Sequence, residues 1–178
     1  KVTSTREGSP QKYTPGAHNF DLSSLKIKVT GGVDPQTDLK APVMSELPVL
    51  PETDVKVGEL VKLNYKATDV GSFIQTARFE FKDANNNTIT FEDGDNDGIA
   101  TERLSHTTMN GEYTLSRISF SDYNKSVNST SYSIDGGGAK VTSTREGSPQ
   151  KYTPGAHNFD LSSLKIKVTG GVDPQTDL

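Results

Sequence analysis

The segment "ELVKLNYKATD" (Glu59–Asp69) decides the fold class, because its polar and apolar residues alternate. One face carries Val61, Leu63, Tyr65 and Ala67, and the opposite face is mostly polar. A period of two residues is typical of a β-strand that buries one face. We therefore expect a half-buried strand over this segment.

The same alternation recurs along the chain, in "QTARFEFK" (Gln75–Lys82), "NNNTITFED" (Asn85–Asp93), "GEYTLSRISFSD" (Gly111–Asp122), "STSYSIDGGG" (Ser129–Gly138) and "DLSSLKIKVTGG" (Asp160–Gly171). In the third of these, the apolar positions change parity between Leu115 and Ile118, which predicts a register break. The expected inward side chains are Ala77, Phe79, Phe81, Ile89, Phe91, Tyr113, Leu115, Ile118, Phe120, Tyr132, Ile134, Leu164, Ile166 and Val168.

No window of useful length has an apolar stripe with the helical period of 3.6 residues. Short strands separated by turn residues favour an all-β fold, an antiparallel Ig-like β-sandwich. Prolines 42, 48 and 51 suit an irregular first strand at an edge. The polar stretch that follows Gly136–Gly138 is either a long loop or a β-excursion.

The first 39 residues, Lys1–Leu39, recur without a change as Lys140–Leu178. Identity over the whole segment indicates a recent duplication, an array that is kept uniform, or a repeat introduced deliberately. We expect a slice of a tandem array, with one complete unit plus a duplicated segment from the adjacent repeat. Neighbouring identical repeats would then be the partners of this unit.

The polar, proline-containing stretch "VDPQTDLKAP" (33–42) is typical of a linker. We therefore expect the sandwich over residues 40–171, with the next linker starting at 172–178. Residues 1–32 would be the tail of a preceding repeat or a permuted closing strand. The closing segment occurs twice, as His18–Val29 and His157–Val168, so the two copies compete for one place, and strand exchange between chains is an alternative.

Composition excludes several functions. The chain has no cysteine, so disulfides and thiolate metal sites are absent. The net charge of −4 and the lack of a basic run argue against nucleic acid as a partner. No apolar run approaches the length of a membrane span, so membrane insertion is not expected.

The acidic segment "EDGDNDG" (Glu92–Gly98) is the sharpest local signal for chemistry. Asp93, Asp95 and Asp97 alternate with glycine and asparagine, and carboxylates this close repel one another unless a cation joins them. Oxygen-only ligands suit Ca²⁺. The segment begins like an EF-hand loop, but its twelfth position is Leu104, so we expect a calcium loop between strands, with Glu92 and Glu102 as further ligands. A solvated acidic turn without an ion is the alternative.

A second acidic set occurs in the linker and in turns. It comprises Asp34, Asp38, Asp69 and Asp122, and Asp173 and Asp177 are the repeat copies of the first two. These carboxylates could bind calcium at the junction of two repeats, or they could be ordinary turn residues. Catalysis has little support, because the chain has no G-x-S-x-G nucleophile pattern and no phosphate-binding glycine loop. His106 is expected in a surface turn, and an acidic pair such as Asp93 and Glu102 would be the only hydrolytic candidate.

Five segments resemble the Ig-like tandem extender repeats of large secreted bacterial calcium-dependent adhesins and related surface proteins. They are "TDLKAPVMSELPV" (37–49), "VKLNYKATDVGS" (61–72), "ARFEFKD" (77–83), "YTLSRISFSDYN" (113–124) and "HNFDLSSLKIKVTGG" (157–171). The resemblance covers most of residues 40–171. Lys40 departs from the threonine that opens the family's usual T-A-P motif.

The resemblance implies an extracellular, non-enzymatic spacer that calcium stiffens. A carbohydrate-binding β-sandwich module is the rival hypothesis, and it would need exposed aromatic side chains as a platform for a glycan. The chain has no tryptophan, and the tyrosines not assigned to the core are Tyr13, its copy Tyr152, and Tyr123.

Overall fold

The computed structural model describes residues 4–6, 9–11, 24–28, 30, 41–69, 71, 73–123, 128–134, 139–145, 148–151 and 159–173. The chain divides into two compact units, Lys1–Gly32 and Val33–Leu178. The described ranges contain β-strands and 3₁₀ turns but no α-helix, so the all-β prediction is confirmed. Within these ranges, no helix is long and apolar enough to cross a membrane.

Unit 1 contains a small antiparallel hairpin of β1 (Ser4–Arg6) and β2 (Ser9–Gln11), in which Thr5 lies opposite Pro10. Further along, residues 24–28 are all exposed. Leu25 exposes 78% of its surface and Ile27 exposes 93%. These two apolar side chains are therefore in solvent.

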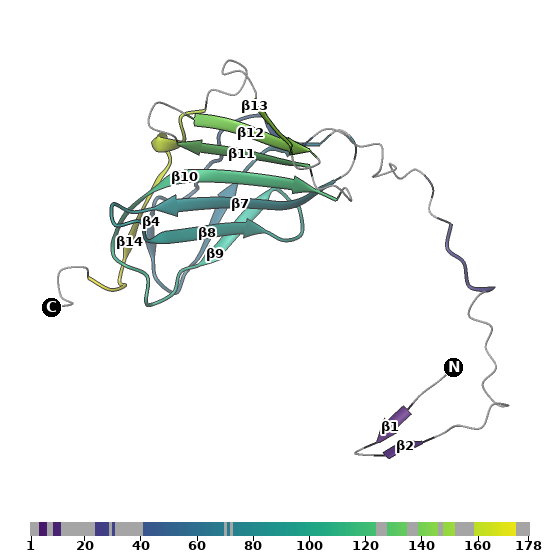
Figure 1. Cartoon of the computed structure of the whole chain (residues 1–178). Helices are drawn as coiled ribbons and strands as arrows, with labels where there is room; N and C mark the ends of the chain where they lie inside the picture. Colours follow the sequence, from purple (N-terminus) through teal and green to yellow (C-terminus); the bar gives the residue numbers. More distant parts are fainter. Residues whose placement is uncertain are drawn as a thin grey trace. The chain divides into compact units, whose positions relative to one another are not determined.

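Unit 2 contains most of the strands. They are β3 (Val43–Met44), β4 (Asp54–Lys56), β5 (Leu60–Asn64), β6 (Ala67–Thr68), β7 (Ile74–Lys82), β8 (Thr88–Asp93), β9 (Ile99–Arg103), β10 (Gly111–Asp122), β11 (Ser129–Ile134), β12 (Ala139–Arg145), β13 (Ser148–Lys151) and β14 (Lys165–Thr169). Figure 1 labels all of these except β3, β5 and β6. A 3₁₀ turn, η2 (Leu161–Ser163), precedes β14.

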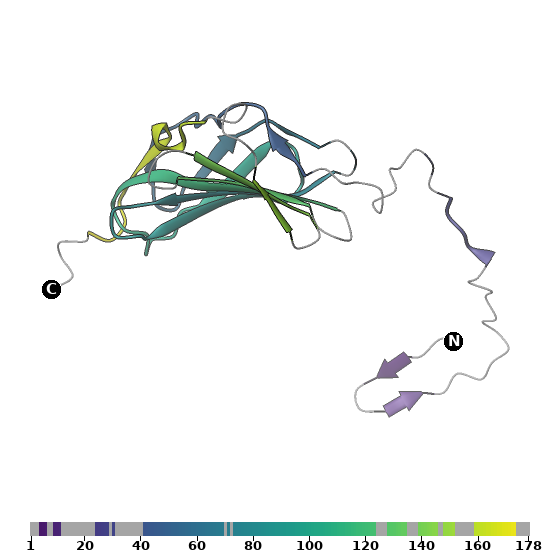
Figure 2. The same ribbon diagram turned by 45° about the horizontal axis from the view of Figure 1, so that its top comes forward.

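One ten-stranded sheet runs in the order β13-β12-β11-β10-β7-β8-β9-β5, and β14 pairs with both β10 and β4. All its pairs are antiparallel except β14 with β4. The sheet curls back at one end, where the Val57 amide donates to the Thr169 carbonyl at 3.1 Å and the Gly58 amide donates to the Leu104 carbonyl at 2.7 Å. In Figure 2 the blue segments of unit 2 lie above the green strands.

The sheet topology bears out only part of the fold prediction. An Ig-like sandwich has two separate sheets, whereas one hydrogen-bonded path here carries eight strands. The finding therefore supports an all-β, chiefly antiparallel fold and leaves the Ig-like assignment unconfirmed.

The alternating patterns predict the core well. Leu63, Phe79, Phe81 and Phe91 are completely buried. The predicted strand over Glu59–Asp69 is interrupted at Tyr65 and Lys66, although the Tyr65 amide still donates to the Gly98 carbonyl at 3.0 Å, in register with the pairing of β5 and β9. Thus β5 and β6 are separate strands.

The predicted register break in β10 is confirmed as a shift in its pairing with β7 between Leu115 and Arg117. The residue at the shift is Ser116, whose hydroxyl donates to the Glu80 carbonyl at 2.9 Å. The extra residue changes the parity of the strand, so that Leu115 and Ile118 both point into the core.

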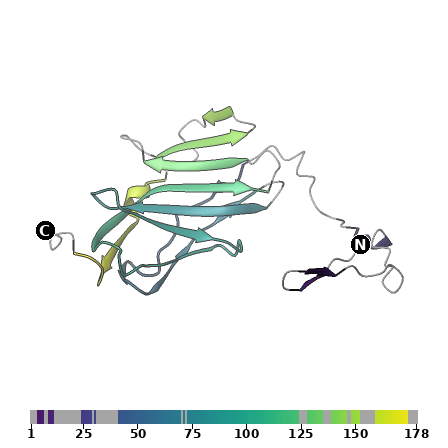
Figure 3. The same ribbon diagram turned by 60° about the horizontal axis from the view of Figure 1, so that its bottom comes forward.

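Two other expectations need correction or completion. Ile134 is 43% exposed rather than buried, because it ends β11 at the rim of the sheet. Strand β9 was not predicted, since only Ile99 and Ala100 in it are apolar. The polar stretch after Gly136–Gly138 contains the hairpin of β12 and β13, which is the β-excursion alternative, and Figure 3 shows it at the outer edge of the sheet.

The chain enters and leaves unit 2 at opposite ends of β10. Val43 pairs with Thr68, and Thr68 lines a cavity together with Ile74. Ile74 in turn pairs with Asp122, the last residue of β10, so Val43 lies at that end of the strand. We call this the proximal end. At the distal end, Gly111, the first residue of β10, pairs with Val168, and the bridge from Met109 to Val172 lies just beyond it.

Candidate metal-binding loop

The acidic loop joins β8, which ends at Asp93, to β9, which begins at Ile99. Two of its residues have left-handed backbone conformations, Asn96 with φ of 60° and Gly98 with φ of 86°. Asparagine and glycine are the residues that adopt this conformation at least cost. The local sequence therefore allows five residues to reverse the chain around one carboxylate.

The Asp93 carboxylate holds the loop together. Its Oδ1 accepts the amides of Asp95 at 3.0 Å and Asn96 at 2.7 Å, and its Oδ2 accepts the Gly98 amide at 3.0 Å. The Tyr65 hydroxyl also donates to Oδ2, at 2.7 Å. Asp93 is only 5% exposed, so these four donors replace its lost hydration.

The three aspartates converge. Each of Asp93, Asp95 and Asp97 offers one carboxylate oxygen, and the three oxygens lie within 4.8 Å of one another. Asp95 and Asp97 are exposed. Asp97 also accepts the Ile99 amide at 2.8 Å, which fixes its direction. This group could hold a metal ion between one buried and two exposed carboxylates.

The electrostatics separate the members of the group. Burial works to raise the pKa of Asp93, but the hydrogen bonds from Tyr65 and from three backbone amides outweigh it, so its pKa lies below the ordinary 3.8. The pKa of Asp95 is raised, first by a hydrogen bond to Asp93 that only its protonated form can donate, and then by the charge of Asp97. The neighbouring carboxylates thus disfavour the charged form of Asp95, and an added cation would remove this repulsion.

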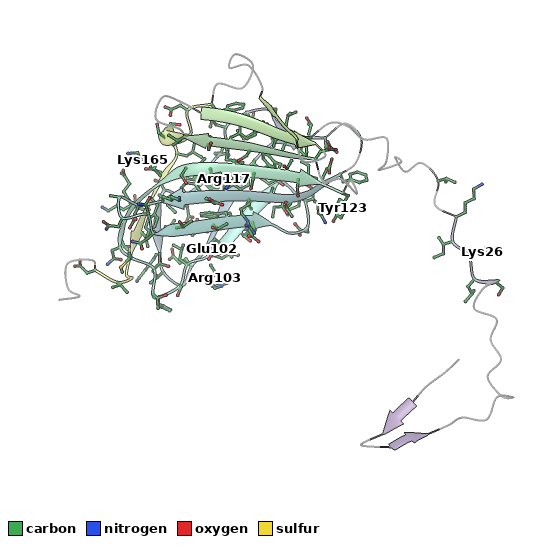
Figure 4. All side chains as sticks on the ribbon, viewed as in Figure 1. Lys26, Glu102, Arg103, Arg117, Tyr123 and Lys165 are labelled. Carbon is green, nitrogen blue, oxygen red and sulfur yellow. The ribbon has the colours of Figure 1, made fainter. Side chains whose placement is uncertain are left out.

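The two predicted glutamates lie outside the three-aspartate group. Glu92 is exposed, and its Oε1 lies 2.6 Å from Arg78 Nη2 in an ion pair. It lines an open groove together with Asp95 and Asp97. Glu102 lies on β9, and burial, followed by the charge of Glu92, raises its pKa. Figure 4 labels Glu102 beside Arg103.

Among the described residues, the group of three or more carboxylates that could hold a metal ion includes no member of the second acidic set. Asp122 is fully buried, and its two carboxylate oxygens accept the backbone and side-chain amides of Asn128 at 3.0 and 2.7 Å. Asp69 lines the proximal cavity with Asp97. Asp34 and Asp38 lie outside the described residues.

The proximal cavity has a volume of about 490 Å³ and opens beside the acidic loop. Phe73, which is 77% exposed, lines it together with Asn96 and Asp97. Tyr123, 61% exposed, donates its amide to the Phe73 carbonyl at 3.2 Å and projects from the end of β10 in Figure 4. Two exposed aromatic residues therefore lie at the proximal end, where the acidic loop is also found.

Sequence reasoning missed Tyr65 as a member of the site, although it correctly placed this residue on the inner face of its strand. Burial and the hydrogen bond to Asp93 raise its pKa, so it remains a donor. The available signal was a tyrosine on an apolar face, since a buried hydroxyl requires a partner. His106 lies in an exposed turn, as predicted.

No protein-family model, no curated protein and no solved structure matches the chain.

Proposed function

We propose that this chain is a non-enzymatic structural repeat of an extracellular bacterial surface adhesin, an Ig-like spacer that bound Ca²⁺ stabilises. The observation that carries the proposal is the place of the acidic loop. Asp97 and Gly98 line the same cavity as Thr68, the partner of Val43, so the loop lies at the end where the chain enters unit 2. In a head-to-tail array this end faces the preceding repeat.

The path of the chain suits a spacer. The chain enters at the proximal end and leaves at the distal end, so consecutive repeats extend the array by the length of one unit. The twelve residues of β10 span about 36 Å at about 3.3 Å per residue. A unit with both termini at one end would add little reach.

Calcium fits the donors of the loop better than a softer metal does. All the side chains in the group offer carboxylate oxygens, the ligands that Ca²⁺ prefers. Gly98 stands at the sixth position from Asp93, where a sharp turn requires glycine in EF-hand loops. A cation here would remove the repulsion around Asp95 and tie β8 to β9.

The expected stabilisation follows from mass action. A site filled at ten to one hundred times its dissociation constant adds about 1.4–2.7 kcal/mol to the free energy of unfolding. Dissociation constants near 10⁻⁴–10⁻³ M are typical of extracellular calcium modules. Calcium at 1 mM, one to ten times these constants, would therefore add about 0.4–1.4 kcal/mol to the free energy of unfolding.

Thermal unfolding of the chain in EDTA and in millimolar Ca²⁺ tests the proposal. We expect Ca²⁺ to raise the melting temperature, Asp95→Asn to abolish the increase, and the matched exposed change Asp54→Asn, on β4, to leave it intact. An equal response of Asp95→Asn and wild type would reject this loop as the site. An unchanged melt of the wild type would reject the calcium mechanism.

A carbohydrate-binding module remains the second candidate, because Phe73 and Tyr123 form an exposed aromatic pair beside polar groups of the proximal cavity. Aromatic faces of this kind could stack on sugar rings. Retention on immobilised polysaccharides, lost in Phe73→Ala but not in the distal change His106→Ala, would favour this function over the spacer.

A further inference from the structure

The two copies of the 39-residue segment have identical sequences and different surroundings. Ile27 and Ile166 are equivalent residues, yet Ile27 is 93% exposed and Ile166 is 1% exposed. Leu25 is 78% exposed, whereas its equivalent Leu164 packs against the core of unit 2. The leading copy therefore displays in solvent the same side chains that the trailing copy buries.

The trailing copy occupies a well-defined slot. Strand β14 lies between β10, with which it is antiparallel, and β4, with which it is parallel. The Leu115 amide donates to the Leu164 carbonyl at 2.9 Å, and the Lys167 amide donates to the Thr53 carbonyl at 2.7 Å. Ile166 and Val168 fill the core between these neighbours. Hydrogen bonds on both edges and two buried side chains specify the sequence that fits.

The leading copy is also prepared locally for the same role. Its hairpin pairs Arg6 with Ser9 and Ser4 with Gln11. The hairpin of β12 and β13 pairs the equivalent residues, Arg145 with Ser148 and Ser143 with Gln150. The register is the same although only the second hairpin continues a sheet, so docking would not require this hairpin to rearrange.

We propose that the leading copy is a donor segment for a second copy of this chain, with residues 24–28 taking the place of residues 163–167 between β10 and β4. The hairpin of residues 4–11 would then replace the pairing of β12 with β13 at the sheet edge. This inference rests on the sequence identity and on the slot, and it does not depend on the calcium-stabilised spacer.

A second molecule is favoured as the acceptor because the linker is short. Val33 is equivalent to Val172, which lies beyond the distal end of β10, whereas Val43 lies at the proximal end. The ten residue-to-residue steps from Val33 to Val43 reach at most about 36 Å when the chain is fully extended. Strand β10 alone spans about 36 Å. If the leading copy filled the slot of its own chain, the linker would therefore have to be fully extended.

In the intact chain the resident β14 has the advantage of its covalent connection, which gives it a high effective concentration. Exchange should therefore be visible when the resident copy is weakened and the leading copy is not. Matched substitutions at Ile166 and Ile27 make this test, because the same side chain is changed in the same sequence context.

We would compare Ile166→Asp, Ile27→Asp and the double variant as full-length chains by thermal unfolding and light scattering over a hundredfold range of concentration. As the concentration of Ile166→Asp rises, we expect its melting temperature to increase and the chain to form dimers or larger assemblies. Ile27→Asp should behave as the wild type. The double variant should lose the concentration dependence.

Two results would overturn the proposal. One is an Ile166→Asp chain that stays monomeric, with a melting temperature independent of concentration, whether it is folded by its own leading copy or not folded at all. The other result concerns two peptides of residues 21–33, one with the native sequence and one with Ile27→Asp, each added to the Ile166→Asp chain. We expect the native peptide to restore the melting transition better than the changed peptide. Equal effects of the two peptides would show that the slot does not accept the leading copy.

Discussion

The leading copy and the trailing copy share every residue, and they differ in what their apolar side chains contact. Ile27 is in solvent in unit 1, while Ile166 is buried in unit 2 between β10 and β4. The hairpins of both copies, in contrast, have the same register. Local sequence is therefore enough for the hairpin, and the closing strand additionally needs a body to dock on.

The difference agrees with what is known of strand formation. Strand preference depends strongly on packing against neighbours. Full burial of an isoleucine side chain contributes about 1.5–3 kcal/mol, a contribution that only the trailing copy obtains. Comparing the two copies thus measures the docking contribution with the sequence held constant.

The largest expected contrast is between Ile166→Ala and Ile27→Ala. Truncating a buried isoleucine to alanine costs about 2–5 kcal/mol, whereas an exposed substitution usually changes stability by less than about 0.5 kcal/mol. Urea unfolding followed by circular dichroism would measure both. Equal losses would show that the leading copy is buried in solution and would break the comparison.

Tyr65→Phe sharpens the comparison from the side of the body. The substitution keeps the aromatic ring, whose centroid lies 5.1 Å from that of Phe79, but it removes the hydroxyl that donates to Asp93. A hydrogen bond to a charged group contributes about 1.5–3 kcal/mol to stability. Amide exchange should become faster at Ile166, which depends on the body, and remain unchanged at Ile27.

The same variant should change the response to acid. Asp93 has a lowered pKa in the folded state, so its stabilisation is present above the unfolded value near 3.8 and is lost as pH falls through the folded value. Loss of the Tyr65 hydroxyl raises the pKa of Asp93, and acid unfolding should then begin at a higher pH. Tyr113→Phe is the matched control, because its hydroxyl donates to the neutral Met109 carbonyl.

The sequence predicted the parts of the fold that depend on periodicity. The alternation around Phe79 and Phe91 and the parity change after Leu115 follow from one buried face per strand, and the structure confirms them. Strand β9 was not predictable in this way, because its place depends on pairing with β5 and on the loop that precedes it.

The acidic loop was predictable as a cluster, since three alternating aspartates with Gly98 favour a tight turn. What the sequence could not reveal was the division of labour, in which Asp93 is buried as the anchor and Asp95 and Asp97 are exposed. That division depends on Tyr65, which is 28 residues away in the chain. The choice between the two copies was equally hidden, because identical sequences carry no information on which one docks.

Gly171→Ala and Gly32→Ala form a third matched pair, with an intermediate effect. A Cβ at Gly171 would overlap the Thr108 carbonyl oxygen, which also accepts the Val172 amide at 3.0 Å. Forcing a methyl group into such a packed site typically costs about 1–3 kcal/mol. Gly32→Ala should leave urea unfolding unchanged within about 0.5 kcal/mol. A destabilised Gly32→Ala chain would contradict the assignment of docking to the trailing copy alone.

The smallest contrast concerns charge. Lys165 Nζ lies 2.7 Å from Glu112 Oε1, and Figure 4 labels Lys165 and its equivalent in the leading copy, Lys26. Both side chains of the pair are about half exposed, so Lys165→Met should cost only about 0.2–1 kcal/mol, less in high salt, and Lys26→Met should cost nothing measurable in urea unfolding. A loss above this range that persists in high salt would mean that the ion pair contributes substantially to docking of the closing strand. The expected small loss would leave docking to the backbone ladder and to the buried isoleucine. Because both copies can supply these features equally, the choice between the copies rests on the covalent connection of the resident strand.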